Sequence, residues 1–326
     1  MMSSLVVEDL VVGIKKKKQT YPIIKGISFS ANQGEITGIV GESGCGKSLT
    51  ALSIMRLIKM PLVNLGGSIT FEGRDLLTLS KKEMYAVRGK EVSMIFQEPM
   101  TSLHPLKKVG EQIGETIREH TSLTKAEEKQ KIISLLTKVG INSAERRMNQ
   151  LPHELSGGMR QRIMIAIALS CESKFLIADE PTTALDVTIQ AQILDLIKKL
   201  TAEQNLGVLL ITHDLGVVSE TCKKVIVMYA GEIVEMGETK LLLPQPKHPY
   251  MEALLKAIPS SMERIEELFT IPGRVPSIYE ETKGCPFAPR CHKRMEVCNT
   301  VHPLLTDVGG HQVRCLLYGE GEHHDN

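Results

Sequence analysis

The segment Gly41–Ser48, with the sequence GESGCGKS, constrains the fold of this chain more than any other feature. It follows a short apolar run, Ile36–Val40, and precedes a segment that is compatible with a helix. Glycines let a main chain curl around a phosphate without side-chain clashes, and the following helix presents its positive N-terminal end to the anion. The pattern predicts a strand, a phosphate-binding loop and a helix. The competing interpretation is a glycine-rich turn with an exposed lysine.

Two side chains of this loop have chemistry that suits a nucleotide. Lys47 is placed to neutralise charge on the β and γ phosphates, and the Ser48 hydroxyl is placed to bind Mg²⁺. The candidate nucleotide-binding residues here are Gly41, Glu42, Ser43, Gly44, Cys45, Gly46, Lys47, Ser48 and Leu49.

A pair of carboxylates, Asp179 and Glu180, follows the apolar run Phe175–Ala178. The C-terminal edge of a parallel sheet is where nucleotides bind. Asp179 is therefore predicted to hold Mg²⁺, and Glu180 to polarise the attacking water as a general base. The structural alternative is that the two acids cap the next helix.

A second anion-binding helix start is predicted at LSGGMRQR, residues 155–162. It places Ser156, Gly157 and Gly158 directly before a helical run that begins at Met159. A single chain has no second triphosphate to bind there. The site makes sense if it closes over a nucleotide that another subunit holds.

Two further residues follow predicted strands. Gln97 comes after Val92–Phe96 and before a helical insert, from where its side chain can reach Mg²⁺ or water as well as a mobile lobe. His213 comes after Val208–Ile211 and is predicted to donate a hydrogen bond to a γ-phosphate. Taken alone, the histidine would be structural and the glutamine a surface residue.

Strands and helices alternate along the chain. The first third is rich in short β-branched runs, a helical insert occupies about residues 98–170, and apolar runs with helices between them follow. This order predicts an α/β fold with a parallel sheet covered on both faces. The proline-rich passage Leu241–Tyr250 predicts a boundary between a domain of residues 1–245 and one of residues 246–326.

The composition excludes several classes of protein. Lys and Arg number 39 and Asp and Glu 38 in 326 residues, so the net charge of +1 argues against a nucleic-acid coat or a basic membrane-surface protein. No apolar run approaches the roughly 20 residues needed to cross a bilayer, and the N-terminus lacks the order of a secretory signal. The chain is therefore expected in the reducing cytoplasm.

Four of the seven cysteines, Cys285, Cys291, Cys298 and Cys315, lie in a C-terminal segment rich in Pro and Gly. A segment that can bury few apolar residues needs a disulfide or a bound metal to hold its fold, and disulfides are not expected in a cytoplasm. The wide spacing favours a 4Fe-4S cluster over zinc, which usually shows a tighter pair. Zinc and unligated structural cysteines remain alternatives, and His292, His302 and His311 are substitute ligands.

The motifs in this order resemble the ATP-binding subunit of an ABC transporter. They are the phosphate loop, Gln97, the LSGGMRQR segment, the Asp179–Glu180 pair, Ala184–Asp186 and His213. The stretch LIADEPTTALDVTIQAQIL, the HPY at residues 248–250 and the cysteine-bearing tail resemble more narrowly the dipeptide and oligopeptide import branch, with nickel importers as close relatives.

The resemblance implies an ABC ATPase fold. This fold has a P-loop RecA-like core, an antiparallel β subdomain and a helical subdomain, here with a small Cys-rich C-terminal extension. It implies two ATP molecules, with Mg²⁺, clasped in a head-to-tail ATPase pair between the phosphate loop of one subunit and Ser156–Met159 of the other. The expected partners are two transmembrane permease subunits, a second and non-identical ATPase, and an extracytoplasmic substrate-binding protein, at the cytoplasmic face of the membrane.

The resemblance also assigns single residues. Asp186 is expected at the seam between subunits, and Tyr21 is the nearest candidate to stack on adenine. Cys45 replaces a more usual serine, which leaves phosphate binding to the main chain and adds a thiol to the site.

Other functions stay open at this point. Peptide import is the leading hypothesis, and the same motor role in an importer of nickel or another small solute is the alternative. A soluble ABC-type ATPase that acts on ribosomes or DNA usually has two fused cassettes or long coiled-coil inserts, and this chain has neither. A subunit that binds ATP without hydrolysing it would not need both Glu180 and His213.

Overall fold

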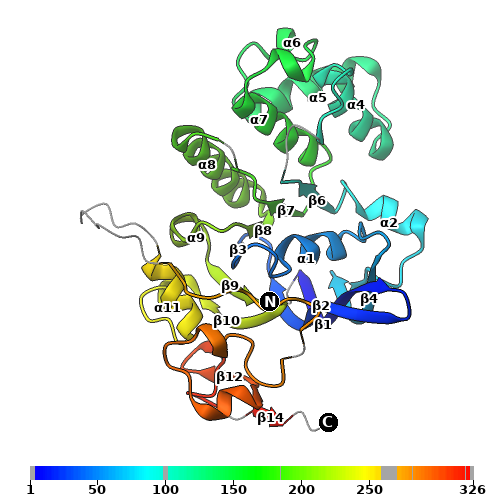
Figure 1. The fold of residues 1–326 in the computed structure, drawn as a ribbon. Helices are drawn as coiled ribbons and strands as arrows, with labels where there is room; N and C mark the ends of the chain where they lie inside the picture. The colour runs from blue at the N-terminus through cyan, green and yellow to red at the C-terminus, as the bar shows by residue number, and fades with distance from the viewer. Residues whose placement is uncertain are drawn as a thin grey trace. The chain divides into compact units, whose positions relative to one another are not determined.

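The structure is a computed structural model that describes residues 4–97, 102–183, 185–257, 270–280, 282–319 and 321–323 (Figure 1). The chain forms two compact units. The first comprises Met1–Leu5, Ala31–Ile36 and Phe71–Ile211, and the second comprises Val6–Ser30, Thr37–Thr70 and Thr212–Asn326. Each unit combines distant parts of the sequence. The boundary predicted after residue 245 lies inside the second unit, and it stays a prediction.

Helices outnumber strands in the described part of the first unit. Its elements are β5 (Arg74–Asp75), α2 (Lys81–Val87), β6 (Val92–Ile95), α4 (Val109–His120), α5 (Lys125–Lys138), α6 (Ala144–Arg147), the 3-10 helix η1 (Pro152–Glu154), α7 (Gly157–Ala168), β7 (Phe175–Asp179), α8 (Val187–Gln204) and β8 (Gly207–Ile211). Three of the strands are parallel and neighbours in the order β8-β7-β6. Every residue of β7 and β8 is buried, as the continuous apolar runs predict for strands covered on both faces.

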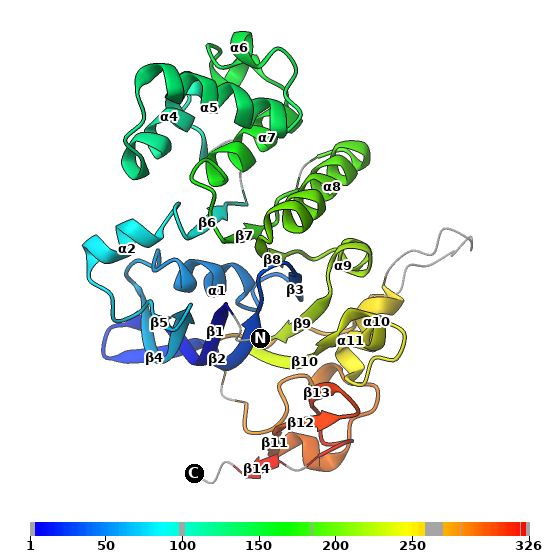
Figure 2. The ribbon, with the colours of Figure 1, turned by 180° about the vertical axis from the view of Figure 1, so that it is seen from behind.

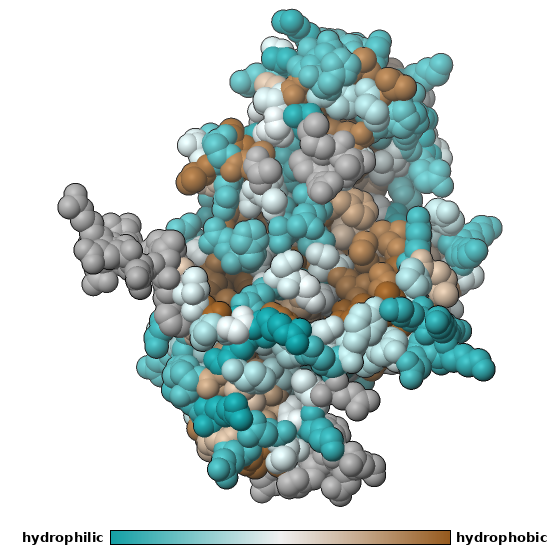
Figure 3. Space-filling model, viewed as in Figure 1, coloured by the Kyte–Doolittle hydropathy of each residue, from teal (hydrophilic) through white to brown (hydrophobic). Residues whose placement is uncertain are grey.

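The helices α4–α7 fall within the predicted helical insert and lie together in both ribbon views (Figures 1 and 2), while the insert as a subdomain stays a prediction. Thr124 begins α5 with a capping box, since its side chain accepts from the Glu127 N–H while the Glu127 carboxylate accepts from the Thr124 N–H. The buried face of α5 carries Ile132, Leu135 and Leu136. The surface over α5 and α6 is mainly hydrophilic in Figure 3. Residues 98–101, at the start of the predicted insert, lie outside the described part.

The second unit contains most of the strands. Its elements are β1 (Leu5–Lys16), β2 (Gln19–Ala31), β3 (Ile36–Val40), α1 (Lys47–Ile54), β4 (Leu62–Phe71), α9 (Leu215–Thr221), β9 (Lys224–Tyr229), β10 (Glu232–Glu238), α10 (Thr239–Leu242), α11 (Pro249–Lys256), the 3-10 helices η2 (Ala288–Arg290) and η3 (Glu296–Asn299), and β11 (Val301–Pro303), β12 (Leu305–Val308), β13 (His311–Arg314) and β14 (Gly321–His323). β1 lies between β2 and β4 in one sheet.

The C-terminal region shares a sheet with earlier strands of the second unit. The order of the strands is β12-β13-β10-β9-β3, in which β3 and β9 are parallel and the other pairs antiparallel. Because Val313 of β13 pairs with Glu235 of β10, β12 and β13 extend this sheet. Both strands lie beyond the predicted boundary after residue 245, and they join the sheet that contains β3, which precedes the phosphate loop.

No helix among the described residues is both long enough and apolar enough to cross a bilayer.

Candidate nucleotide site

The phosphate loop connects β3 to α1 in the second unit, as predicted. Gly41 has φ +151°, and a Cβ at this position would lie 2.2 Å from the Met228 carbonyl oxygen. Gly46 has φ +106° and begins α1. Both positions need glycine, the first for space and the second for a left-handed backbone.

Lys47 closes the loop on itself. Its side chain is buried, and Nζ donates to the carbonyl oxygens of Gly41 at 2.7 Å and Glu42 at 3.0 Å. A cation held in this way at the start of a helix is a ready site for a phosphate group. The Cys45 thiol is buried, and this burial raises its pKa, although the charge of Lys47 opposes the increase. The thiol is therefore protonated at neutral pH.

His213 belongs to the same unit and lies near the loop. It lines a cavity of about 510 Å³ together with Gly41 and Glu42. The next residue, Asp214, caps α9 by accepting from the N–H of Gly216 at 2.8 Å. The structure therefore brings the predicted γ-phosphate donor and the phosphate loop to one cavity.

Tyr21, the predicted adenine-stacking residue, lies in β2. Its ring meets that of Tyr279 edge to face, with the centroids 4.8 Å apart. The cavity of about 960 Å³ that it lines contains no residue of the phosphate loop. The stacking role of Tyr21 stays a prediction.

The two predicted carboxylates end β7 in the first unit. Asp179 is buried, with 4% of its surface exposed, and Glu180 has φ +45°. The Glu180 N–H donates to the Ile211 carbonyl oxygen at 2.9 Å, which holds this left-handed turn. Gln97 Nε2 donates to Glu180 Oε2 at 3.0 Å, so two predicted catalytic residues are in direct contact.

Thr183 is a contact of Glu180 that the sequence analysis missed. Its hydroxyl donates to the same Oε2 at 2.8 Å. A threonine three residues after a carboxylate gives no signal in the sequence, because only the turn after β7 folds it back onto Glu180.

The LSGGMRQR segment begins α7, as predicted. Ser156 is exposed and caps the helix, accepting from the Met159 N–H at 3.4 Å. Gly157 is the first residue of α7, and a Cβ on Gly158 would lie 2.8 Å from Ile189 Cγ2, so this glycine allows α7 and α8 to approach closely. The helix start is confirmed, and its contact with a nucleotide stays a prediction.

Asp186 is the N-cap of α8. Its Oδ1 accepts from the Ile189 N–H at 2.9 Å. Its place at a seam between subunits stays a prediction. Ala184, which begins the predicted Ala184–Asp186 motif, lies outside the described residues.

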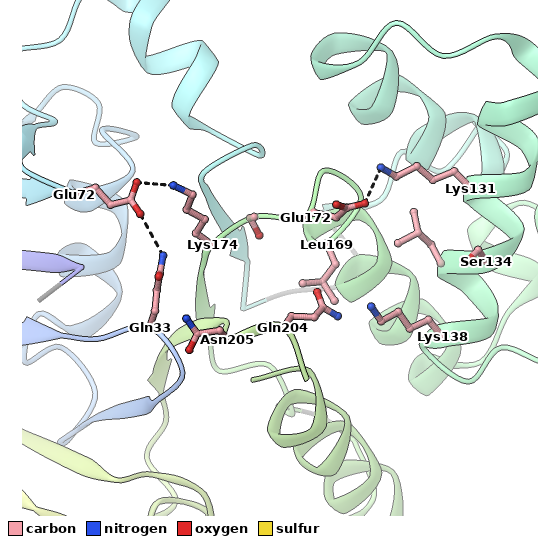
Figure 4. Close-up of a pocket in the computed structure, with 12 residues that line it drawn as sticks. Gln33, Glu72, Lys131, Ser134, Lys138, Leu169, Glu172, Lys174, Gln204 and Asn205 are labelled. Atoms are coloured by element: carbon pink, nitrogen blue, oxygen red, sulfur yellow. Dashed lines mark hydrogen bonds and ion pairs between the residues drawn. The ribbon is translucent and has the colours of Figure 1, made fainter. Parts of the chain in front are cut away.

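The first unit also has a polar pocket of about 660 Å³ that contains none of the predicted site residues (Figure 4). Ion pairs join Glu72 to Lys174 and Glu172 to Lys131 within it. The pocket lies beside residues 173 and 174, which precede β7, whereas Asp179 is at the other end of that strand.

The four C-terminal cysteines are free thiols close enough to affect one another. Burial raises the pKa of Cys285 to about 12, and the other three cysteines contribute to this increase. In the part of the chain that the structure describes, no three His, Cys, Asp or Glu side chains are arranged as a metal site. The structure thus gathers the predicted cluster ligands without forming a finished site.

Known proteins match this chain over almost its whole length. The ABC transporter family model matches residues 24–183, and the model described as the oligopeptide/dipeptide transporter C-terminal region matches residues 234–298. The chain is 50% identical to the oligopeptide transport ATP-binding protein AppD of Bacillus subtilis, over 98% of each chain. It is 48% identical to the oligopeptide transport ATP-binding protein OppD of Salmonella typhimurium, over 96% of this chain and 93% of the relative.

A solved structure shows the same fold. It is a dimer of the ATP-binding cassette MJ0796 in a post-hydrolysis state with ADP and Pi, 26% identical, with a TM-score of 0.65 over 72% of this chain and 98% of that one. The nucleotide motifs, the fold and the relatives all indicate the same family. The chain therefore belongs to the ABC transporter family of ATP-binding proteins, in the branch that carries the oligopeptide/dipeptide transporter C-terminal region.

Proposed function

We propose that this protein is the ATP-hydrolysing motor subunit of an ABC importer for dipeptides or oligopeptides. Its relatives AppD and OppD are oligopeptide transport ATP-binding proteins, and the chain matches each of them over nearly the whole length. The observation that carries the hydrolytic part is the contact of Gln97 with Glu180 at the end of β7. A motor that hydrolyses ATP needs such a carboxylate, whereas a subunit that only binds ATP does not.

In the proposed reaction the phosphate loop binds ATP, with Lys47 and the loop N–H groups on the phosphates. Ser48 and Asp179 are the proposed ligands of Mg²⁺, with Gln97 near them, and the metal would neutralise the transferring phosphate. Glu180 accepts a proton from the attacking water, and His213 donates to the γ-phosphate. The products are ADP and phosphate.

The proposed work of the motor requires two subunits. Ser156–Met159 of one subunit would close over the ATP held by its partner, a non-identical ATPase, with Asp186 at the seam. A ligand shifts such an equilibrium only through its higher affinity for the closed state, which contacts shared between subunits supply. Closure would drive two permease subunits at the cytoplasmic face of the membrane, supplied by an extracytoplasmic binding protein.

The test is reconstitution. The chain with its permeases, second ATPase and binding protein, in vesicles that contain ATP, should take up labelled dipeptides or oligopeptides. Uptake should stop when Glu180→Gln replaces the wild type. Uptake of Ni²⁺ instead of peptide would select the nickel alternative. ATP hydrolysis that neither permeases nor peptide affect would favour a soluble ATPase.

We also infer that Cys285, Cys291, Cys298 and Cys315 bind a 4Fe-4S cluster, which would act as a staple for the C-terminal region. Burial raises the pKa of Cys285, Cys291 and Cys315, and main-chain hydrogen bonds from Phe287, Lys293 and Leu317 oppose that increase. Each donor lies two residues after its cysteine and would stabilise a thiolate ligand. Because the described arrangement is not a finished metal site, the sulfur atoms would have to approach one another on binding.

Iron and sulfide analysis of anaerobically purified protein, with its visible absorption spectrum, tests the cluster. Iron and sulfide in equal amounts would support it. A colourless sample that contains zinc would select the zinc alternative, and a metal-free folded protein would leave the cysteines structural.

A further inference from the structure

Glu42, the second residue of the phosphate loop, forms an ion pair with the C-terminal region of the chain. The Arg290 guanidinium donates from Nη1 to Glu42 Oε2 at 2.6 Å and from Nη2 to Glu42 Oε1 at 2.9 Å. The Arg290 side chain is 4% exposed and that of Glu42 27%. A buried, bidentate pair of this kind sets orientation as well as charge.

Arg290 is itself held in position. Nε donates to the Pro272 carbonyl oxygen at 3.0 Å, and Nη2 to that of Ile271 at 3.3 Å. The guanidinium carbon lies 5.8 Å from the centre of the Tyr229 ring and 6.0 Å from that of Phe287. Because its remaining donors and its flat faces are occupied, the side chain is presented to Glu42 in one orientation.

The main chain of Glu42 is held from the same side. Its N–H donates to the Tyr250 hydroxyl at 2.8 Å, and its carbonyl oxygen accepts from Lys47. Tyr250 is fully buried, with its ring centre 4.7 Å from that of Tyr229 and 5.3 Å from that of Phe287. Three groups of Glu42 therefore have a defined partner, and two of those partners lie in the C-terminal region.

The HPY segment that carries Tyr250 is anchored in turn. The Glu235 carboxylate of β10 accepts from the N–H groups of Lys247 and His248, each at 2.9 Å. The Tyr250 N–H donates to His248 Nδ1 at 3.0 Å. These bonds connect a buried strand to the phosphate loop through Tyr250.

We propose that Arg290 is a positioning residue for ATP binding, with Tyr250 as its main-chain counterpart. The proposal rests on the proposed function, in which this loop binds ATP. An unpaired carboxylate beside the phosphates would repel them, and Arg290 removes that charge while it holds the loop in shape. Through this pair, the C-terminal region that holds Arg290 contributes to ATP affinity.

The test compares Arg290→Ala, Arg290→Lys and the double variant Arg290→Ala with Glu42→Gln. Arg290→Ala should raise the KM for ATP about tenfold and change kcat less than about twofold, because a charge is left unpaired before chemistry begins. Arg290→Lys keeps the positive charge, so its KM for ATP should lie between those of the wild type and Arg290→Ala. The double variant should bring KM to within about threefold of the wild type, since it removes the unpaired charge.

Arg274→Ala is the matched control, because Arg274 is an exposed arginine of the same region that pairs with Glu280. It should leave KM unchanged. Binding of a fluorescent ATP analogue and thermal unfolding are measured in parallel. The proposal is overturned if Arg290→Ala stays folded with an unchanged KM, or if Glu42→Gln gives no recovery in the double variant. If the wild-type protein did not hydrolyse ATP at all, the proposed function itself would be refuted.

If Arg290→Ala does not fold, Arg290→Lys and Tyr250→Phe replace it. Tyr250→Phe removes only the hydroxyl that accepts from the Glu42 N–H, and it should raise KM about threefold with kcat retained. An unchanged KM in both folded variants would overturn the proposal.

Discussion

Gln97 Nε2 lies 3.0 Å from Glu180 Oε2 and donates a hydrogen bond to it. Thr183 donates to the same oxygen at 2.8 Å, so one carboxylate oxygen has two donors. Glu180 also has the left-handed φ of +45°, which a residue with a Cβ adopts only when its surroundings hold it there. The proposed general base is thus placed by its own turn and by two neighbouring side chains.

Replacing Glu180 by Gln should lower ATP hydrolysis by a factor of about 10²–10⁴, because the amide cannot accept the proton from water. ATP binding should persist, and an ATP-bound dimer should accumulate. Phosphate release and size-exclusion chromatography with ATP measure the two effects. Asp195→Asn, on the exposed side of α8 where Asp195 pairs with Lys198, is the control and should behave as the wild type. Normal hydrolysis by the Glu180 variant would show that the base is another residue.

Gln97→Ala should lower kcat about tenfold while the Kd for ATP stays within about twofold. The reason is that the substitution removes one of the two donors that orient the Glu180 carboxylate and leaves the phosphate loop intact. Steady-state hydrolysis and titration with a fluorescent ATP analogue separate the two constants. Gln130→Ala, at an exposed position of α5, controls for the loss of an amide. A Gln97 variant with normal kcat would contradict a positioning role.

Gly41→Ala should abolish ATP binding. Its Cβ would lie 2.2 Å from the Met228 carbonyl oxygen, so either the loop or β9 must move. The free energy of unfolding should fall by about 1–3 kcal/mol. Gly66→Ala, where the added carbon meets no atom within 4 Å, should have little effect on either quantity. Isothermal titration with ATP and urea unfolding test both variants, and normal ATP affinity in Gly41→Ala would argue against the described loop geometry.

Stability should fall as the pH is lowered below 6.5, because His248 is buried. Desolvation lowers its pKa from 6.5 to about 3 in the folded chain, so only the unfolded chain binds a proton between these values. Protonation of this residue in the unfolded chain should lower the free energy of unfolding by about 2 kcal/mol at pH 5 relative to pH 6.5. Burial raises the pKa of the adjacent Glu235, which acts in the opposite direction.

His248→Asn removes the titrating ring and keeps an acceptor for the Tyr250 N–H at the start of α11. Because Glu235 is present in both proteins, its contribution cancels in the comparison. Urea unfolding at pH 5 and 6.5 should give a smaller difference for the variant than for the wild type. His292→Asn, which replaces a half-exposed histidine, should keep the full difference. Equal differences for wild type and His248→Asn would show that the histidine is protonated in the folded state.

The local elements of the site could be predicted from sequence. Gly41–Ser48 follows a buried strand, Asp179 ends another, and Ser156 caps a helix, each as expected. These features depend on neighbours within a few residues, whose backbone preferences and spacing are visible in the sequence. The family followed from the order of such segments.

Contacts between distant residues were not predictable. Arg290 and Glu42 are 248 positions apart, and nothing near either residue identifies the other. Nothing in the sequence of the C-terminal segment indicates that β13 pairs with β10. The hydrogen bond from Thr183 to Glu180 and the ring contact between Tyr21 and Tyr279 likewise have no signal in the sequence.

Sequence patterns alone were enough to identify the phosphate-loop segment, the carboxylates Asp179 and Glu180 after an apolar strand, and the transporter family. The side chains that hold these groups in place became clear from the folded structure. Local patterns determine the conformation of short segments. The partner of a buried charge depends instead on which distant segments pack together in the folded chain. That is why Arg290 was visible only after the C-terminal region had been placed against the loop.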